Sequence, residues 1–277
     1  MELFDSHFHY CGENSPLEYF RNCLTEAAVP PQSAAGVPER LSLMAVGGDY
    51  LESCRAREFA QVVETAWFAA GVYPHNAGEY LAAPESFSEF RNHPKLKAIG
   101  ELGLDYYYGG ASPEDQKRVF GMFLDLAREW ELPAIVHLRD RDDSPVAFEE
   151  GYALLKPFAA AGGRFVVHCF AGTPEWAEKF LALGAYLGVT GMVTFSRAHN
   201  IREALSVIPD DRLLIETDSP YLAPVPHRGE PNHPGFLALI AARVAAERHS
   251  ETGEIARLTA ENARKFFRIG EFTEVTK

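Results

Sequence analysis

Eight short runs of apolar residues recur along the chain and alternate with segments of helical periodicity. The runs are rich in β-branched and aromatic residues, and most are apolar throughout rather than alternating with polar residues. This pattern is typical of strands in a parallel sheet that is covered on both faces. We predict strands at 2–5, 41–48, 66–74, 96–103, 132–138, 164–170, 186–191 and 213–218.

The segments between the predicted strands carry helix start and stop signals. In 112–130, Ser112 can cap a helix, Pro113 suits its first position, and apolar residues recur on one face. The segment 173–184 begins in a similar way and reaches Gly184 where a helix should end. Further helices are predicted from residue 16 onward, at 52–64, at 235–249 and at 259–269.

The alternation of strands and helices continues without a Pro-, Gly- or Ser-rich linker, so we expect residues 1–277 to form one domain. Two architectures fit, a (β/α)8 TIM barrel and an open doubly wound sheet. Ionisable residues favour the α/β barrel, because they stand at the carboxyl ends of predicted strands that include the first and the last. An open sheet would not bring those two strands together.

Composition narrows the class of protein. The chain has 47% hydrophobic residues, and its 26 Lys and Arg against 39 Asp and Glu give a net charge of −13. Such a chain can bury a large core, but it is a poor candidate for broad, nonspecific binding to nucleic acid or anionic membranes. The four cysteines form no CxxC pair, and the sequence has neither a membrane-length apolar run nor a basic leader. We therefore expect a cytoplasmic protein without a membrane role.

Four histidines and two acidic residues lie at the carboxyl ends of five predicted strands. They are His7, His9, Glu101, His137, His168 and Asp218. This face of a barrel carries the chemistry of barrel enzymes. One histidine on an apolar strand is usually structural, but the coincidence of six such residues predicts a divalent metal site. The set can hold two ions if one carboxylate bridges them.

The motifs around these residues resemble those of the TatD family of metal-dependent hydrolases. "DSHFHY", "GELGLDYYY", "LPAIVHLRD", "VVHCFAGT", "LGVTGMVTF" and "LLIETDSPYLAP" occur in the order and near the spacing of that family. The resemblance implies an amidohydrolase-type TIM barrel with two and sometimes three divalent ions, and deoxyribonuclease activity. It also implies that the same six residues are the metal ligands.

The roles of the six residues follow as hypotheses. His7, His9 and Asp218 would hold one ion, His137 and His168 the other, and Glu101 would bridge the two. Metal-bound water would be the nucleophile, and Asp218 could accept or orient its proton, so Asp218 and Glu101 are the candidate catalytic residues. Imidazole-rich ligation suits zinc or manganese better than magnesium, although nuclease assays often supply magnesium.

Other polar residues near the strand ends are candidates for supporting roles. Asp5 and Glu216 precede His7 and Asp218 by two positions and could hydrogen-bond an imidazole or a main-chain group, or simply be buried polar residues. Asp105, in the loop after the fourth strand, could position a ligand or form a turn. The candidates for substrate contact are His75, Arg139 and Arg228.

Two loops depart from the pattern of the family. The segment after strand eight reads "HRGEPNHPGF", with Pro231 and His233 where many members have a basic residue and a glutamate. The strand-five loop, "HLRDRDDSPVAFEEG", carries extra acidic residues. Both changes argue against tight binding of long DNA.

Three function classes therefore remain at this point. The leading one is a nuclease acting on DNA ends or single strands. The second is a hydrolase of a small ester, lactone, amide or phosphate monoester, and the third is a metal-stabilised barrel without turnover. No protein partner is predicted.

Overall fold

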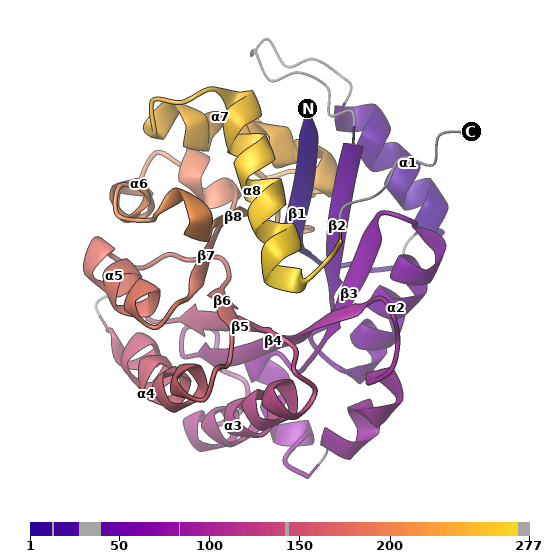
Figure 1. Ribbon diagram of the computed structural model, residues 1–277, viewed down its shortest axis with the longest axis vertical. Helices are drawn as coiled ribbons and strands as arrows, with labels where there is room; N and C mark the ends of the chain where they lie inside the picture. Colours follow the sequence, from indigo (N-terminus) through magenta and orange to yellow (C-terminus); the bar gives the residue numbers. More distant parts are fainter. Residues whose placement is uncertain (13, 28–39, 83, 142–143, 271–277) are drawn as a thin grey trace.

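The computed structural model of the chain contains one sheet of eight parallel strands, in which each strand pairs with the next along the chain. The structure describes residues 1–12, 14–27, 40–82, 84–141 and 144–270. The strands are β1 (Glu2–Phe8), β2 (Arg40–Val46), β3 (Ala66–Ala70), β4 (Leu96–Asp105), β5 (Ala134–Arg139), β6 (Phe165–Val167), β7 (Tyr186–Val189) and β8 (Leu213–Ile215). All eight predicted strands are present (Figure 1).

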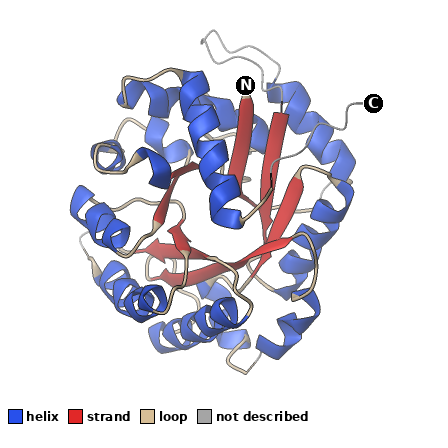
Figure 2. Cartoon of the chain, viewed as in Figure 1, coloured by secondary structure: helices blue, strands red, loops and turns tan. Residues whose placement is uncertain are grey.

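Helices follow the strands and surround the sheet (Figure 2). The α-helices are α1 (Pro16–Ala27), α2 (Tyr50–Val62), α3 (Pro113–Glu129), α4 (Val146–Ala160), α5 (Pro174–Ala182), α6 (His199–Leu205), α7 (Leu237–Glu247) and α8 (Thr252–Phe267). The 3-10 helices are η1 (Pro74–Glu79), η2 (Pro84–Phe90), η3 (Gly191–Thr194), η4 (Asp210–Arg212) and η5 (Pro234–Phe236). None of the helices in the described ranges is both long and apolar enough to cross a membrane.

The barrel closes between β1 and the segment that follows β8. The main-chain N–H of Asp218 donates to the carbonyl of His7 at 2.9 Å, and that of His9 donates to the carbonyl of Ser219 at 2.8 Å. These bonds join the first strand to the last, as a barrel requires and an open sheet does not. The predicted TIM barrel is confirmed.

Several boundaries differ from the predictions. β8 ends at Ile215, so Asp218 lies beyond the strand rather than at its end. β3 ends at Ala70 rather than at residue 74, and the connection that follows it forms η1 and η2. Two helices that we did not predict, α4 and α6, have N-cap residues, Pro145 and Ala198, that make no side-chain hydrogen bond. At α4 the more distant Asp140 accepts from the N–H groups of the first turn instead. By contrast, Ser112 caps α3 as expected, accepting from the N–H of Asp115.

Apolar side chains fill the barrel toward the amino ends of its strands. Phe4 is fully buried and stacks on Trp67 on one side and on Phe267 of α8 on the other, with ring centroids 5.8 and 6.0 Å apart. In Figure 1, α8 lies across the barrel beside β1. The opposite end is left for the polar residues at the carboxyl ends of the strands.

Removing the ring of Phe4 should destabilise the barrel strongly. Phe4→Ala leaves a cavity between two aromatic rings, and such changes cost about 3–5 kcal/mol. Urea unfolding followed by circular dichroism measures the loss, and Phe4→Leu, which refills most of the space, should lose less. A loss below about 1 kcal/mol for the alanine variant would contradict this packing.

Candidate metal centre at the mouth of the barrel

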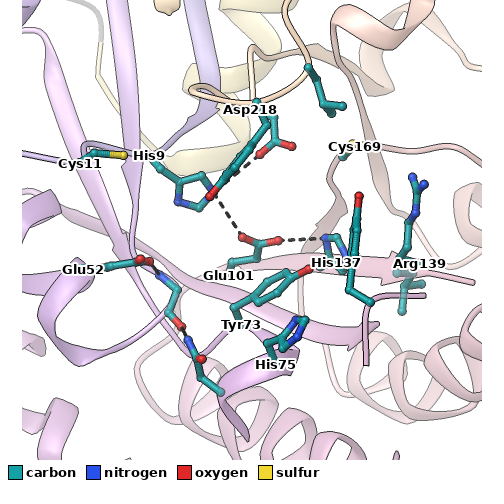
Figure 3. Close-up of a pocket in the computed structure, with 16 residues that line it drawn as sticks. His9, Cys11, Glu52, Tyr73, His75, Glu101, His137, Arg139, Cys169 and Asp218 are labelled. Atoms are coloured by element: carbon teal, nitrogen blue, oxygen red, sulfur yellow. Dashed lines mark hydrogen bonds and ion pairs between the residues drawn. The ribbon is translucent and has the colours of Figure 1, made fainter. Parts of the chain in front are cut away.

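The six predicted ligands meet at the carboxyl end of the barrel, below a cavity of about 550 Å³. Figure 3 shows Glu101 of β4 between His9, which follows β1, and His137 of β5, with Asp218 also facing His9. Glu101 is 3% exposed, and His7 and His168 are buried still deeper. The barrel thus gathers side chains from five strand ends around one carboxylate.

One oxygen of Glu101 faces a first set of donor atoms. Glu101 Oε2 lies 3.6 Å from His7 Nε2 and 3.5 Å from His9 Nε2. Asp218 Oδ1 lies 3.7 and 3.6 Å from the same two nitrogens, which are 3.2 Å apart. The first set therefore joins two imidazole nitrogens to one oxygen from each of two carboxylates.

The other oxygen of Glu101 faces a second set. Glu101 Oε1 lies 3.0 Å from His137 Nδ1 and 2.7 Å from His168 Nε2, and the two nitrogens are 3.1 Å apart. The carboxylate therefore spans both sets, with one oxygen in each, as a bridging ligand would.

Both sets fit a small divalent cation. A tetrahedral ion with bonds of about 2.0–2.1 Å spaces its ligand atoms about 3.3 Å apart, close to the separations in both sets. In the described chain, three trios of side chains have ligand atoms that all lie within 4.8 Å of one another: His7, His9 and Glu101; Glu101, His137 and His168; and His7, His168 and Glu216. Asp218 is in none of the three. The buried Nδ1 of His7 has no hydrogen-bond partner in the structure.

Charge within the cluster favours ionised carboxylates. Burial alone raises the pKa of Glu101, but the charge of His168 and hydrogen bonds from His137, His168 and His7 outweigh it and hold that pKa well below its usual value. Burial likewise lowers the pKa of His9, yet Asp218 and Glu101 raise it to about 9. The ionised carboxylates therefore favour positive charge within the cluster, and bound metal ions would supply that charge.

Hydrogen bonds outside the cluster select the ring nitrogens that face it. His9 Nδ1 lies 3.0 Å from the carbonyl of Val46, and His137 Nε2 lies 3.2 Å from Asp105 Oδ2. A carbonyl or carboxylate only accepts, so these nitrogens carry the protons and leave His9 Nε2 and His137 Nδ1 free as ligands. Asp105 itself is held by the hydroxyl of Tyr73, which donates to Oδ2 at 2.6 Å.

Asp105 is thus a positioning residue for His137, and its replacement should weaken metal binding. It is the last residue of β4 rather than a loop residue, and the N–H groups of Tyr107 and Tyr108 also donate to it. Asp105→Asn should lower affinity at the second donor set about 10- to 100-fold. Metal titration by calorimetry checks this, with Asp115→Asn at the exposed start of α3 as the control. Unchanged affinity would show that Asp105 is only a turn residue.

Asp5 and Glu216 are both buried, but they have different neighbours. The side chain of Asp5 accepts from the N–H and hydroxyl of Thr217 and from the N–H of His7, so it braces the main chain rather than an imidazole. Burial raises its pKa to about 8 despite these bonds. Glu216 accepts from Cys169 N at 2.5 Å and from Ser6 Oγ, and it lies 3.5 Å from His168 Nδ1.

Strict alternation along β1 would place Asp5 below His7 on the same face, but the strand does not alternate strictly. The pairing of β1 with β2 shifts register between Asp5 and Phe8, and Phe4 already occupies the barrel interior. Asp5 therefore turns toward Thr217, beside the seam that closes the barrel.

Two of the three substrate candidates line the cavity. His75, in η1, stacks on Tyr73 with ring centroids 5.8 Å apart, and Arg139, the last residue of β5, lies over the ring of Tyr107. Arg228 is placed elsewhere. It is exposed, lies over Phe195 at 4.4 Å and is absent from the cavity wall.

The structure adds residues that sequence reasoning missed. Glu52, Tyr73, Cys169 and Tyr221 line the cavity. Tyr73 lies near the carboxyl end of the predicted strand 66–74, as the chosen histidines do in theirs, so its position was a usable signal. The others lie on a helix or in loops, where no periodicity tells which way a side chain points.

Known proteins share the sequence pattern and the fold of this chain. Residues 4–268 match the family model described as TatD related DNase. The chain is 35% identical over 268 residues to YabD of Bacillus subtilis, an uncharacterized metal-dependent hydrolase, covering 96% of this chain and 99% of YabD. It is 37% identical to the 3'-5' ssDNA/RNA exonuclease TatD of Erwinia tasmaniensis, covering 82% of this chain and 88% of that protein. The crystal structure of the Escherichia coli TatD homologue YjjV aligns with a TM-score of 0.81 at 26% identity, covering 97% and 98% of the two chains.

Proposed function

The chain belongs to the TatD family of metal-dependent hydrolases, and from this premise we propose that it is a nuclease that removes nucleotides from the ends of single-stranded DNA or RNA. Relatives named 3'-5' ssDNA/RNA exonucleases support this substrate class. They favour it over a small ester, lactone, amide or phosphate monoester, and over a barrel without turnover.

One observation carries the proposal. The buried carboxylate of Glu101 places one oxygen in each of two donor sets that share the geometry of metal ligands. Such a bridged pair is the recurrent arrangement for in-line displacement at phosphate esters. We propose two divalent ions, held by His7, His9 and Asp218 on one side of Glu101 and by His137 and His168 on the other. We assign no ion to the group of His7, His168 and Glu216, because the Glu216 carboxylate already accepts two hydrogen bonds.

Divalent ions bound there would supply the Lewis acidity that activates water and neutralises the phosphate. The chain itself provides the other parts. Asp218 lines the cavity with 13% of its side chain exposed, so it can take the proton of the attacking water. Its φ of +55°, unusual for a residue with a side chain, turns its carboxylate toward His7 and His9. Arg139 can pair with the phosphate from the opposite wall, and His75 can contact the substrate.

Four of the six proposed ligands are imidazoles, which supports zinc or manganese as the metal. None of the four cysteines, all in the described part of the chain, forms a disulfide, which supports a cytoplasmic setting. We also take residues 1–277 as a single domain, since the strands of one barrel run from Glu2 to Ile215 and α8 ends at Phe267. We propose no protein partner.

A digest of end-labelled oligonucleotides tests the function. Purified protein with Mn²⁺ or Zn²⁺ should release mononucleotides from single strands faster than from duplexes, and EDTA should stop the release. A parallel panel of lactones, amides and phosphate monoesters serves as the comparison. Cleavage of the panel without any release of nucleotides would contradict the nuclease and support the small-substrate hydrolase.

A further inference from the structure

We propose, on the basis of the nuclease function above, that Tyr108 and Tyr221 stack on the two nucleobases that flank the scissile phosphate. Both tyrosines line the cavity above the donor sets. Their side chains are 65% and 62% exposed, which is unusual for aromatic rings that have a cavity beside them to fill. Neither residue has a role in the metal centre.

The two rings stand on opposite walls. Tyr108 follows β4 and Tyr221 follows β8, and in a closed sheet with the order β1 to β8 these strands are four positions apart in either direction. The ring of Tyr221 meets His9 edge-on with centroids 6.2 Å apart. That of Tyr108 meets Tyr107 edge-on at 4.7 Å. A phosphate at Glu101 would therefore have one ring on each side.

Most of the exposed large hydrophobic side chains lie at the mouth of the barrel. Eight large hydrophobic side chains are exposed among the described residues, and seven of them stand in loops that follow strands or at the first residues of helices. These seven are Leu17, Leu51, Tyr107, Tyr108, Val146, Tyr221 and Val225. Helices of the barrel begin at its carboxyl end, so this rim surrounds the cavity. The eighth, Val62, ends α2 at the opposite end.

Charge alone cannot hold a strand at this cavity. Of the described residues that line it, only Arg139 is permanently positive, whereas Glu52, Glu101 and Asp218 are acidic. Metal ions at the donor sets would offset two of the three carboxylates but would engage only the phosphate next to them. Attraction along a longer phosphate backbone, the usual source of strand affinity, is therefore weak here.

Aromatic stacking supplies the affinity for a single strand that electrostatic attraction does not supply here. Removing an aromatic partner weakens single-strand binding by about 1–3 kcal/mol per base, or about 5- to 150-fold. Stacking also selects single strands, because bases in a duplex already stack on one another. Two exposed rings on either side of the phosphate site thus account for affinity and strand preference together in an acidic protein.

Binding of labelled single strands tests the inference. Fluorescence anisotropy with Mn²⁺ compares an oligonucleotide with one that is abasic at its last two 3' positions, both with phosphorothioate linkages that resist hydrolysis. The intact strand should bind at least about tenfold more tightly. Tyr108→Ala and Tyr221→Ala should each weaken it about 5- to 150-fold but change the abasic strand less than about twofold. Tyr108→Phe and Tyr221→Phe keep the ring and should bind as the wild type does.

Val62→Ala removes an exposed apolar side chain at the far end of the barrel and is the matched control, with no expected change. Equal affinity for both strands, or no binding of either, would overturn the stacking role. So would alanine variants that change self-association in sedimentation but leave strand affinity intact, since the rim would then be a protein interface. Base-dependent binding without release of nucleotides would support stacking and contradict the nuclease.

Discussion

Replacing Glu101 with glutamine should abolish metal-dependent hydrolysis, lowering kcat/KM about 1000-fold or more. The two oxygens of Glu101 belong to different donor sets, 3.5 Å from His9 Nε2 and 3.0 Å from His137 Nδ1. An amide has one oxygen that can act as a ligand, and its NH2 group cannot, so the variant can serve at most one set. Metal analysis by mass spectrometry should accordingly find fewer ions per chain.

Glu52→Gln is the matched control for this change. Glu52 lines the same cavity but accepts from the N–H of Gly48 and lies outside the two donor sets around Glu101. We expect it to retain metal content and to lose less than about tenfold in rate. Circular dichroism establishes that each variant is folded. A folded Glu101→Gln protein with full metal content and full activity would contradict the bridging role.

Asp218→Asn should separate proton transfer from metal binding. The amide oxygen can still occupy the position of Oδ1 near His7 and His9, but an amide cannot accept the proton of the attacking water. General-base catalysis contributes about 100- to 10,000-fold, so kcat should fall by that amount while metal content changes little. Single-turnover kinetics on a labelled oligonucleotide measures the loss.

As the control for Asp218→Asn, activity and metal content are measured in the same preparation. Loss of both together would make Asp218 a ligand without a role in proton transfer. Retention of both would remove Asp218 from the catalytic machinery altogether, and the proton acceptor would then have to be sought among the other residues of the cavity wall.

The predicted ligands could be identified from the sequence because most of them lie at the ends of strands. Parallel strands in a barrel all end at one face, so His7, Glu101, His137 and His168 could be placed together without any knowledge of the loops. The number of ligands gave the expectation that one carboxylate bridges two ions, and the motifs implied that the same six residues are the ligands. The geometry of Glu101 agrees with that expectation, and the metal content of the protein stays to be measured.

The side-chain directions of loop residues could not be predicted in the same way. The side-chain direction of Asp218 depends on a left-handed turn beyond β8, and that of Arg228 depends on its contact with Phe195. The register shift in β1 turned Asp5 away from the imidazoles. Each of these outcomes is set by contacts between segments far apart in the chain, which periodicity along one strand does not encode.

Anomalous diffraction from crystals grown with Mn²⁺ or Zn²⁺ tests the account most directly. We predict two anomalous peaks about 3.5–4 Å apart, one on each side of the Glu101 carboxylate. One peak should contact His7, His9 and Asp218, and the other His137 and His168. A single peak that Glu101 does not touch, or no peak among these side chains at saturating metal, would contradict a two-ion centre at the mouth of this barrel.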